Sequence, residues 1–184
     1  MHPKQITMKL KTEKILMILK ILALLAGIGF SIECGSQILS LAASFLNPEW
    51  AKRVYNVDLT IFSIREYSIR QYVYAMSIVI AISALKAIIW FLVYDLLQKF
   101  QLKSPFTMKV TEKLEKIAWL LLGIWVIMSI IGKSYSHYLM KSTGIQLPVN
   151  HSGDEYFFVA GIVYIISQIF KRGIEIQEEN ELTV

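Results

Sequence analysis

Two ionisable residues interrupt the long apolar stretches of this chain, and they are the first candidates for chemistry. Lys86 lies near the middle of the stretch 72–97, and Glu33 lies near the end of the stretch that begins at residue 15. A cation at the centre of a bilayer costs about 2.5–3.5 kcal/mol on insertion scales, so Lys86 needs water, a snorkelling route or a counter-ion. At 1.5 Å per residue, Lys86 would stand roughly 20 Å above Lys99 and Glu33 roughly 28 Å above Lys14. Two long side chains could bridge that offset, which makes Glu33 the nearest counter-ion by depth.

An intramembrane pair of Glu33 and Lys86 has two interpretations. It could bind a proton or an ionic substrate, or it could only hold two helices together. Transport sites usually bring together more than one pair of ionisable residues. We therefore favour a structural role for the pair and keep a transport site as the alternative.

Reactive groups elsewhere follow no catalytic or metal-binding pattern. His137, His151, Asp154 and Glu155 are ligand types, but their spacing matches no metal site known to us. Cys34 is the only cysteine, which excludes an internal disulfide and a cysteine cluster, and no Ser or Cys has an identifiable His partner. We expect no catalytic residue, no metal and no cofactor, and an intramembrane enzyme is the weakest of the functional classes.

The C-terminal segment 173–184 is acidic and stands beside a basic surface. It could dock onto the basic turn within 99–116 or onto a basic cytoplasmic partner, or it could be a solvated tail that keeps this end of the chain off anionic lipid. Composition alone leaves these alternatives even. The residues expected at a partner contact are Glu178, Glu179, Asn180, Glu181, Leu182, Lys103 and Lys109.

The elements that would position these residues are four apolar blocks in a chain of 184 residues, 55% of them hydrophobic. A bilayer requires roughly 20 residues per spanning helix, and each block is long enough or nearly so. The sequence predicts an all-α, four-helix transmembrane bundle that forms one domain over residues 1–184. The expected helices are 14–46, 71–99, 105–140 and 155–172, followed by an acidic cytoplasmic tail at 173–184. The first helix could be continuous or could break near Gly35.

The connections carry weaker signals. Within 47–70, Val57, Leu59 and Ile61 alternate with polar residues, the period-two pattern of a short strand in the outer segment. Ser104-Pro105 has the residue types of a helix start, with Ser as the cap and Pro in the first turn. The following residues predict an amphipathic lead-in to the third helix along the inner surface.

The distribution of positive charge predicts the orientation in the membrane. Twelve of the nineteen basic residues fall on the side that holds the termini, six fall on the other side, and Lys86 lies between. The positive-inside rule then places both termini in the cytoplasm. The net charge of +5 does not indicate nucleic-acid binding, because the basic residues flank apolar blocks and form no stripe interleaved with aromatics.

Two stretches resemble a known family. The basic turn with Pro105-Phe106 leads into an amphipathic run ending near Leu122, and the chain ends Glu179-Asn180-Glu181-Leu182-Thr183-Val184. Both are similar to bacterial membrane proteins grouped as domain of unknown function 2975, whose members end in a Glu-Asn-Asp-Leu-Thr-Val-like tail; Glu181 replaces the Asp. The resemblance implies a genetic context, since members are often encoded beside a small helix-turn-helix DNA-binding protein. It carries over no catalytic residues.

Taken together, these features predict a multi-pass protein of the bacterial inner membrane that is not an enzyme. We expect a regulatory or interaction protein whose cytoplasmic face acts on a small helix-turn-helix regulator. The alternative is a small transporter or channel subunit using Glu33 and Lys86, which would be a homo-oligomer because four helices leave little room for a path. We expect the chain to contact the lipid bilayer and not to bind nucleic acid directly.

Overall fold

The structure is a computed structural model that describes residues 3–47, 49, 59–99, 107–145, 147 and 153–181. Its elements are α1 (Pro3–Leu46), α3 (Leu59–Tyr67), α4 (Ile69–Lys99), α5 (Met108–Trp125), the π-helix η1 (Val126–Gly132), α6 (Lys133–Thr143) and α7 (Asp154–Glu181). Within these ranges every regular element is a helix. Four helical segments are long and apolar enough to span a membrane: Thr12–Leu46, Ile69–Lys99, Met108–Thr143 and Asp154–Asn180. The predicted all-α, multi-pass architecture is therefore confirmed.

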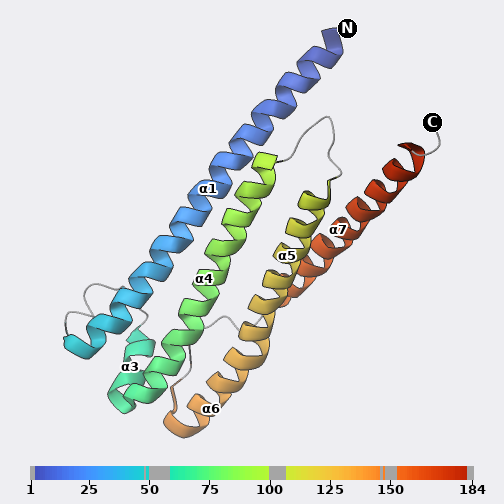
Figure 1. Cartoon of the computed structure of the whole chain (residues 1–184). Coiled ribbons are helices and arrows are strands. Elements are labelled where there is room, and N and C mark those ends of the chain that lie inside the picture. The colour runs from blue at the N-terminus through green and yellow to red at the C-terminus, as the bar shows by residue number, and fades with distance from the viewer. Residues whose placement is uncertain are drawn as a thin grey trace.

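The spanning helices pack in the order α1, α4, α5 and α7, so that α4 and α5 are central and α1 and α7 lie at the two edges (Figure 1). The buried apolar core runs along the central helices, with Met76 and Ile89 from α4, Ile117 and Ile124 from α5, and Met128 from η1. Most large apolar side chains of α1 and α7 are exposed. Exposed apolar helix faces of this length are suited to contact with lipid tails.

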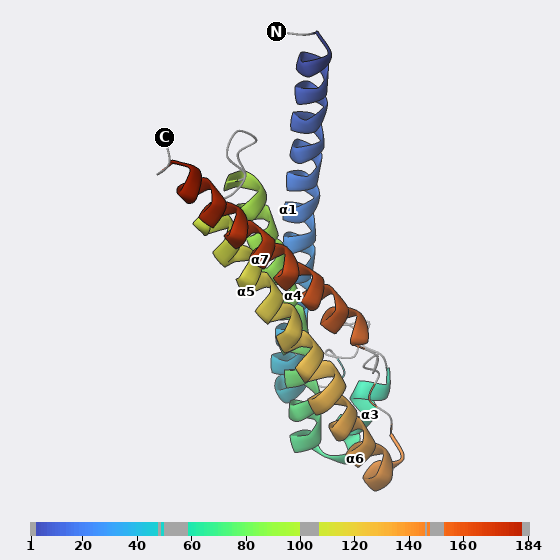
Figure 2. The same cartoon turned by 90° about the vertical axis from the view of Figure 1, so that its right-hand side faces the viewer.

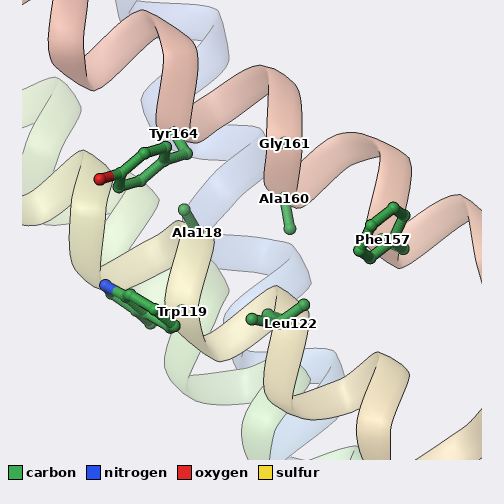
Figure 3. A pocket seen from close by; sticks show the side chains of 7 residues that line it. All are labelled: Ala118, Trp119, Leu122, Phe157, Ala160, Gly161 and Tyr164. Carbon is green, nitrogen blue, oxygen red and sulfur yellow. The ribbon is translucent and has the colours of Figure 1, made fainter.

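The molecule has two distinct ends. The beginning of α1 and the end of α7 lie at one end, which we call the terminal end (Figures 1 and 2). Helices α3 and α6 lie at the opposite end, which we call the α3–α6 end. The first residues of α1 and the last residues of α7 therefore lie on the same side of the membrane-spanning part.

The first spanning helix is one continuous rod. α1 has 44 residues and passes through Gly35 without a break, and at 1.5 Å per residue it is roughly 66 Å long. That length is about twice the hydrocarbon thickness of a bilayer, so α1 extends well past the other helices at the terminal end (Figure 2).

The predicted strand in the outer segment is wrong. Leu59 and Ile61 belong to helix α3, while Val57 lies outside the described residues. A single short strand has no partner for its backbone groups, whereas a helix satisfies them internally. Ile61 and Ile64, one helical turn apart, are both buried. The short alternation in the sequence concealed this helical spacing.

The third spanning segment is a composite of α5, η1 and α6. α5 begins at Met108, with Thr107 in an extended conformation as its N-cap and without a side-chain capping bond. The proposed cap at Ser104-Pro105 lies outside the described residues. η1 is a π-helix of seven residues, an uncommon form that recurs at functional sites. α6 ends at Thr143 and is capped by Gly144, whose φ of 73° is the left-handed conformation that glycine adopts without steric cost.

Polar side chains tie the spanning helices to one another near the terminal end. Asp95 of α4 forms ion pairs with Lys99, at 3.1 Å, and with Lys113 of α5. Gln168 of α7 donates to the carboxylate of Glu115 of α5 at 3.0 Å. These contacts fix the register of α4 against α5 and of α5 against α7.

Candidate functional site

Polar side chains gather along the contact between α1 and α4. Glu33, Gln37, Ser40 and Ser44 of α1 are four, three and four residues apart, so they share one helix face. Gln37, Ser40 and Ser44 are buried. Ser83 of α4, also buried, faces them. We call this set the polar seam.

Glu33 is the centre of the polar seam. Its Oε1 accepts hydrogen bonds from Gln37 Nε2 and from Ser83 Oγ, both at 3.3 Å. Ser83 Oγ also lies 3.2 Å from the carbonyl oxygen of Val79. Gln37 Oε1 is buried and has no hydrogen-bond partner among the described residues. A buried acceptor without a partner costs about 1–3 kcal/mol, so this position is suited to a donor from outside the chain, such as water.

Lys86 lies one helical turn from Ser83, and Phe30 lies one turn from Glu33. The Lys86 ammonium stands 5.5 Å from the centroid of the Phe30 ring, within range of a cation–π contact. No ion pair within 4 Å joins Glu33 to Lys86 in the part of the chain that the structure describes. The two sequence-predicted residues therefore occupy adjacent levels of the same helix interface, with different partners.

Arg65 extends the polar seam to the α3–α6 end. Its Nη2 donates to the carbonyl oxygen of Ser44 at 2.7 Å, and its guanidinium lies 5.6 Å from the Phe62 ring centroid. Nε of Arg65 is buried without a partner among the described residues. In the sequence Arg65 is one of the six basic residues on the side opposite the termini, and its contact with Ser44 depends on α3 being a helix.

The acidic C-terminal segment is a helical extension of α7. The helix continues through Gly173 to Glu181, and Arg172 forms an ion pair with Glu175 at 2.8 Å. Residues 175–180 are all exposed, among them Glu178, Glu179 and Asn180. We call residues 174–181 the acidic extension; at 1.5 Å per residue it is roughly 12 Å long. The segment expected as an acidic tail is helical as far as Glu181.

The remaining predicted contact residues are only partly described. Lys109 is exposed in the first turn of α5, at the terminal end. Lys103 and Leu182 lie outside the described residues, and only the backbone of Glu181 is described. The terminal end therefore presents the acidic extension of α7, with the exposed Lys109 at the start of the adjacent helix α5.

The residues considered as metal ligands form no metal-binding group within the described part of the chain. His137 is exposed on α6, Asp154 and Glu155 are exposed in the first turn of α7, and His151 lies outside the described residues. Among the residues that the structure describes, no group of three or more His, Cys, Asp or Glu side chains is placed to hold a metal ion.

Comparison with known families supplies one match. The family described as "Protein of unknown function (DUF2975)" matches residues 38–184. The matched region contains α3 to α7 and the end of α1, including Lys86 and the acidic extension, but not Glu33. No curated protein and no solved structure matches the chain significantly.

Proposed function

We propose a regulatory role for this chain, which belongs to the DUF2975 family of proteins of unknown function. In this proposal it is a multi-pass protein of the bacterial inner membrane with both termini in the cytoplasm. Its terminal end binds a small helix-turn-helix transcription regulator, and it catalyses no reaction. The observation that carries the proposal is the acidic extension, a helix that continues past the apolar part of α7 and exposes its carboxylates.

The chemistry of the acidic extension favours a basic protein as its partner. Glu175, Glu178 and Glu179 are exposed within two helical turns, and a helix presents them in fixed directions. DNA-binding domains carry a basic surface that neutralises phosphates. An acidic helix would attract the same surface and compete with DNA for it, because electrostatic complementarity steers association. Membrane capture of the regulator would thus lower its occupancy on DNA.

A transporter or channel subunit remains the second candidate function, because of the polar seam. Glu33, Gln37 and Ser83 place an exposed carboxylate, a buried amide and a buried hydroxyl together along the contact between two membrane helices. The unpartnered Gln37 Oε1 adds an acceptor that water or a solute could use. A conducting form would require several copies of the chain, since α1 and α4 alone enclose no path.

The experiment that tests the regulatory role is co-purification from native membranes in mild detergent. Glu178→Gln with Glu179→Gln removes two charges from the acidic extension. Asp154→Asn with Glu155→Gln removes two charges from the opposite end of the same helix and is the matched control. We expect a small basic DNA-binding protein to co-purify with the intact protein and the control, and to be lost from the Glu178/Glu179 variant.

Two results would contradict the regulatory role. One is equal recovery of the same proteins with both variants, and the other is that no DNA-binding protein is recovered with the intact chain. Reconstituted vesicles then provide the test of the second function. Solute or ion flux that persists after truncation at Gly173, and that falls when Lys86 is replaced by Met, would support a transporter.

A further inference from the structure

A groove opens on the membrane-facing surface between α4 and the composite of η1 and α6, outside the polar seam and the acidic extension. Its volume is about 570 Å³, in the range of small-molecule sites. Gln71, Tyr74, Tyr135 and Tyr138 line it toward the α3–α6 end. Ile78, Ala81 and Ile131 line the deeper part. The groove thus changes from polar and aromatic to apolar along its length.

The polar end of the groove is built by contacts between the two walls. Tyr135 Oη lies 2.7 Å from both the backbone oxygen and the side-chain oxygen of Gln71, so it donates across from α6 to α4. The Tyr135 ring meets Tyr74 edge-on and stacks on Tyr138, with centroid distances of 6.5 Å in both pairs. Tyrosines are enriched where hydrocarbon meets headgroups. This end of the groove therefore fits the headgroup level of a bilayer.

The length of the groove matches the depth of an acyl chain. On α4 the lining runs from Gln71 to Ala81, which is roughly 15 Å along the helix axis. The hydrocarbon core of one leaflet is about half of the 30 Å bilayer core, or roughly 15 Å. An acyl chain that enters beside the tyrosines would pass Ile131 and end near Ala81 and Ile127.

Two basic residues lie within one helical turn of the tyrosines at the polar end of the groove. Arg70 precedes Tyr74 by four residues, and Lys141 follows Tyr138 by three, so each lies on the groove-lining face of its helix. Both are exposed. Arg and Lys at the headgroup level attract phosphate, Arg through paired donors and Lys as a point charge. The charge at the mouth therefore complements an anionic headgroup.

We propose that this groove binds an anionic phospholipid of the leaflet at the α3–α6 end. One acyl chain lies against Ile78, Ala81 and Ile131, the glycerol region meets Gln71 and the tyrosines, and the phosphate lies near Arg70 and Lys141. The π-helix η1 provides the deep wall, because Ile131 belongs to it. This site is independent of the regulatory function proposed for the terminal end.

Native mass spectrometry of the purified protein tests the site with phosphatidylglycerol and phosphatidylcholine of equal chain length. We expect the protein to retain phosphatidylglycerol in preference. Lys141→Gln should lower that preference about fivefold, since each basic residue near an anionic headgroup contributes about 1 kcal/mol. Lys133→Gln is the matched control, an exposed lysine of α6 two residues from Ile131 and so on another face, and it should leave the preference unchanged.

The acyl chain is tested separately. Ala81→Leu should reduce binding of both lipids by filling the deep part of the groove. Lysophosphatidylglycerols of increasing chain length, measured on the unaltered protein, should bind more tightly until the chain reaches the depth of Ala81. Three results would each overturn the proposal. The first is an equal effect of Lys141→Gln and Lys133→Gln on lipid preference. The others are displacement of the lipid by inorganic phosphate alone and a dimer that covers the groove.

Discussion

At the scale of single residues, the polar seam shows how far a sequence can locate an intramembrane site. The apolar context of Lys86 and Glu33 marks both as costly, so their selection follows from hydropathy alone. The partners of these two residues cannot be found from hydropathy, because contact across two helices depends on how each helix is rotated about its axis. The structure places Lys86 beside Phe30 and Glu33 beside Ser83, one turn apart along the same interface.

The first prediction concerns the coupling of Glu33 to its neighbours. Ser83 donates directly to the Glu33 carboxylate, so Glu33→Gln and Ser83→Ala should be non-additive, with a coupling of about 1 kcal/mol. Glu33→Gln and Lys86→Met should be nearly additive, within about 0.5 kcal/mol, since no direct contact joins the two side chains. Each coupling is measured by a double-mutant cycle, which compares the unaltered protein, the two single variants and the double variant. The free energy of unfolding of each protein is determined in mixed micelles of increasing SDS content. A larger coupling to Lys86 than to Ser83 would restore the ion pair that the sequence suggested.

At the scale of elements, one glycine of α1 lies close against a side chain of α4. A Cβ at Gly27 would lie 3.1 Å from a ring carbon of Phe91 on α4, whereas a Cβ at Gly29 would meet nothing within 4 Å. Glycine in a helix interior is disfavoured relative to alanine by roughly 0.5–1 kcal/mol. The two glycines are therefore matched in helix and depth but differ in what they contact.

The second prediction follows from that difference. Gly29→Leu should be tolerated, because the side chain enters open space beside the helix. Gly27→Leu should push α1 away from Phe91 and destabilise the protein by about 1–3 kcal/mol, the usual cost of overpacking. The same SDS titration measures both variants. Equal stability of the two would show that α1 does not pack on α4 at this level.

The third prediction concerns the attachment of α3 to α1. Arg65 donates to the Ser44 carbonyl oxygen, and its loss leaves that acceptor without its charged donor, at a cost of about 1–3 kcal/mol. Arg65→Gln should therefore accelerate hydrogen exchange in Leu59–Tyr67 while exchange in the centre of α4 stays unchanged. Arg70→Gln, at an exposed position just beyond α3, is the control and should leave α3 protected. Uniformly faster exchange throughout α4 would mean instead that Arg65 stabilises the whole fold.

The elements differ in how well the sequence predicts them, for physical reasons. Long apolar stretches are required by the bilayer, so the four spans are found from hydropathy. α3 has only nine residues, and its first residues alternate between apolar and polar. The helix is favoured by a tertiary contact, the burial of Ile64 against α4, which the sequence does not reveal. The π-helix η1 has no signal in apolar periodicity. The acidic extension looked like a tail because its charge conceals a good helix-forming composition, rich in Glu.

At the scale of the whole molecule, hydropathy predicts the number of spans but not their arrangement. Helices that face lipid are apolar on all sides, so no amphipathic stripe marks which face packs on a neighbour. The sequence predicts a four-helix bundle without the order of its helices, and the structure supplies that order, with α1 and α7 at the edges. The apolar edge faces are the surfaces through which further copies of the chain would associate, and the second candidate function requires such association.

The fourth prediction concerns the orientation on which the regulatory role depends. In a Cys34→Ser background, Glu178→Cys marks the terminal end and Lys141→Cys marks the α3–α6 end, and both positions are exposed. The excess of positive charge at the terminal end should hold it in the cytoplasm, because the positive-inside rule concerns Lys and Arg near the membrane and not net charge. A membrane-impermeant maleimide should thus label Lys141→Cys in intact cells and Glu178→Cys only after the membrane is opened. Labelling of Glu178→Cys in intact cells would place the acidic extension outside, where it could not meet a DNA-binding protein.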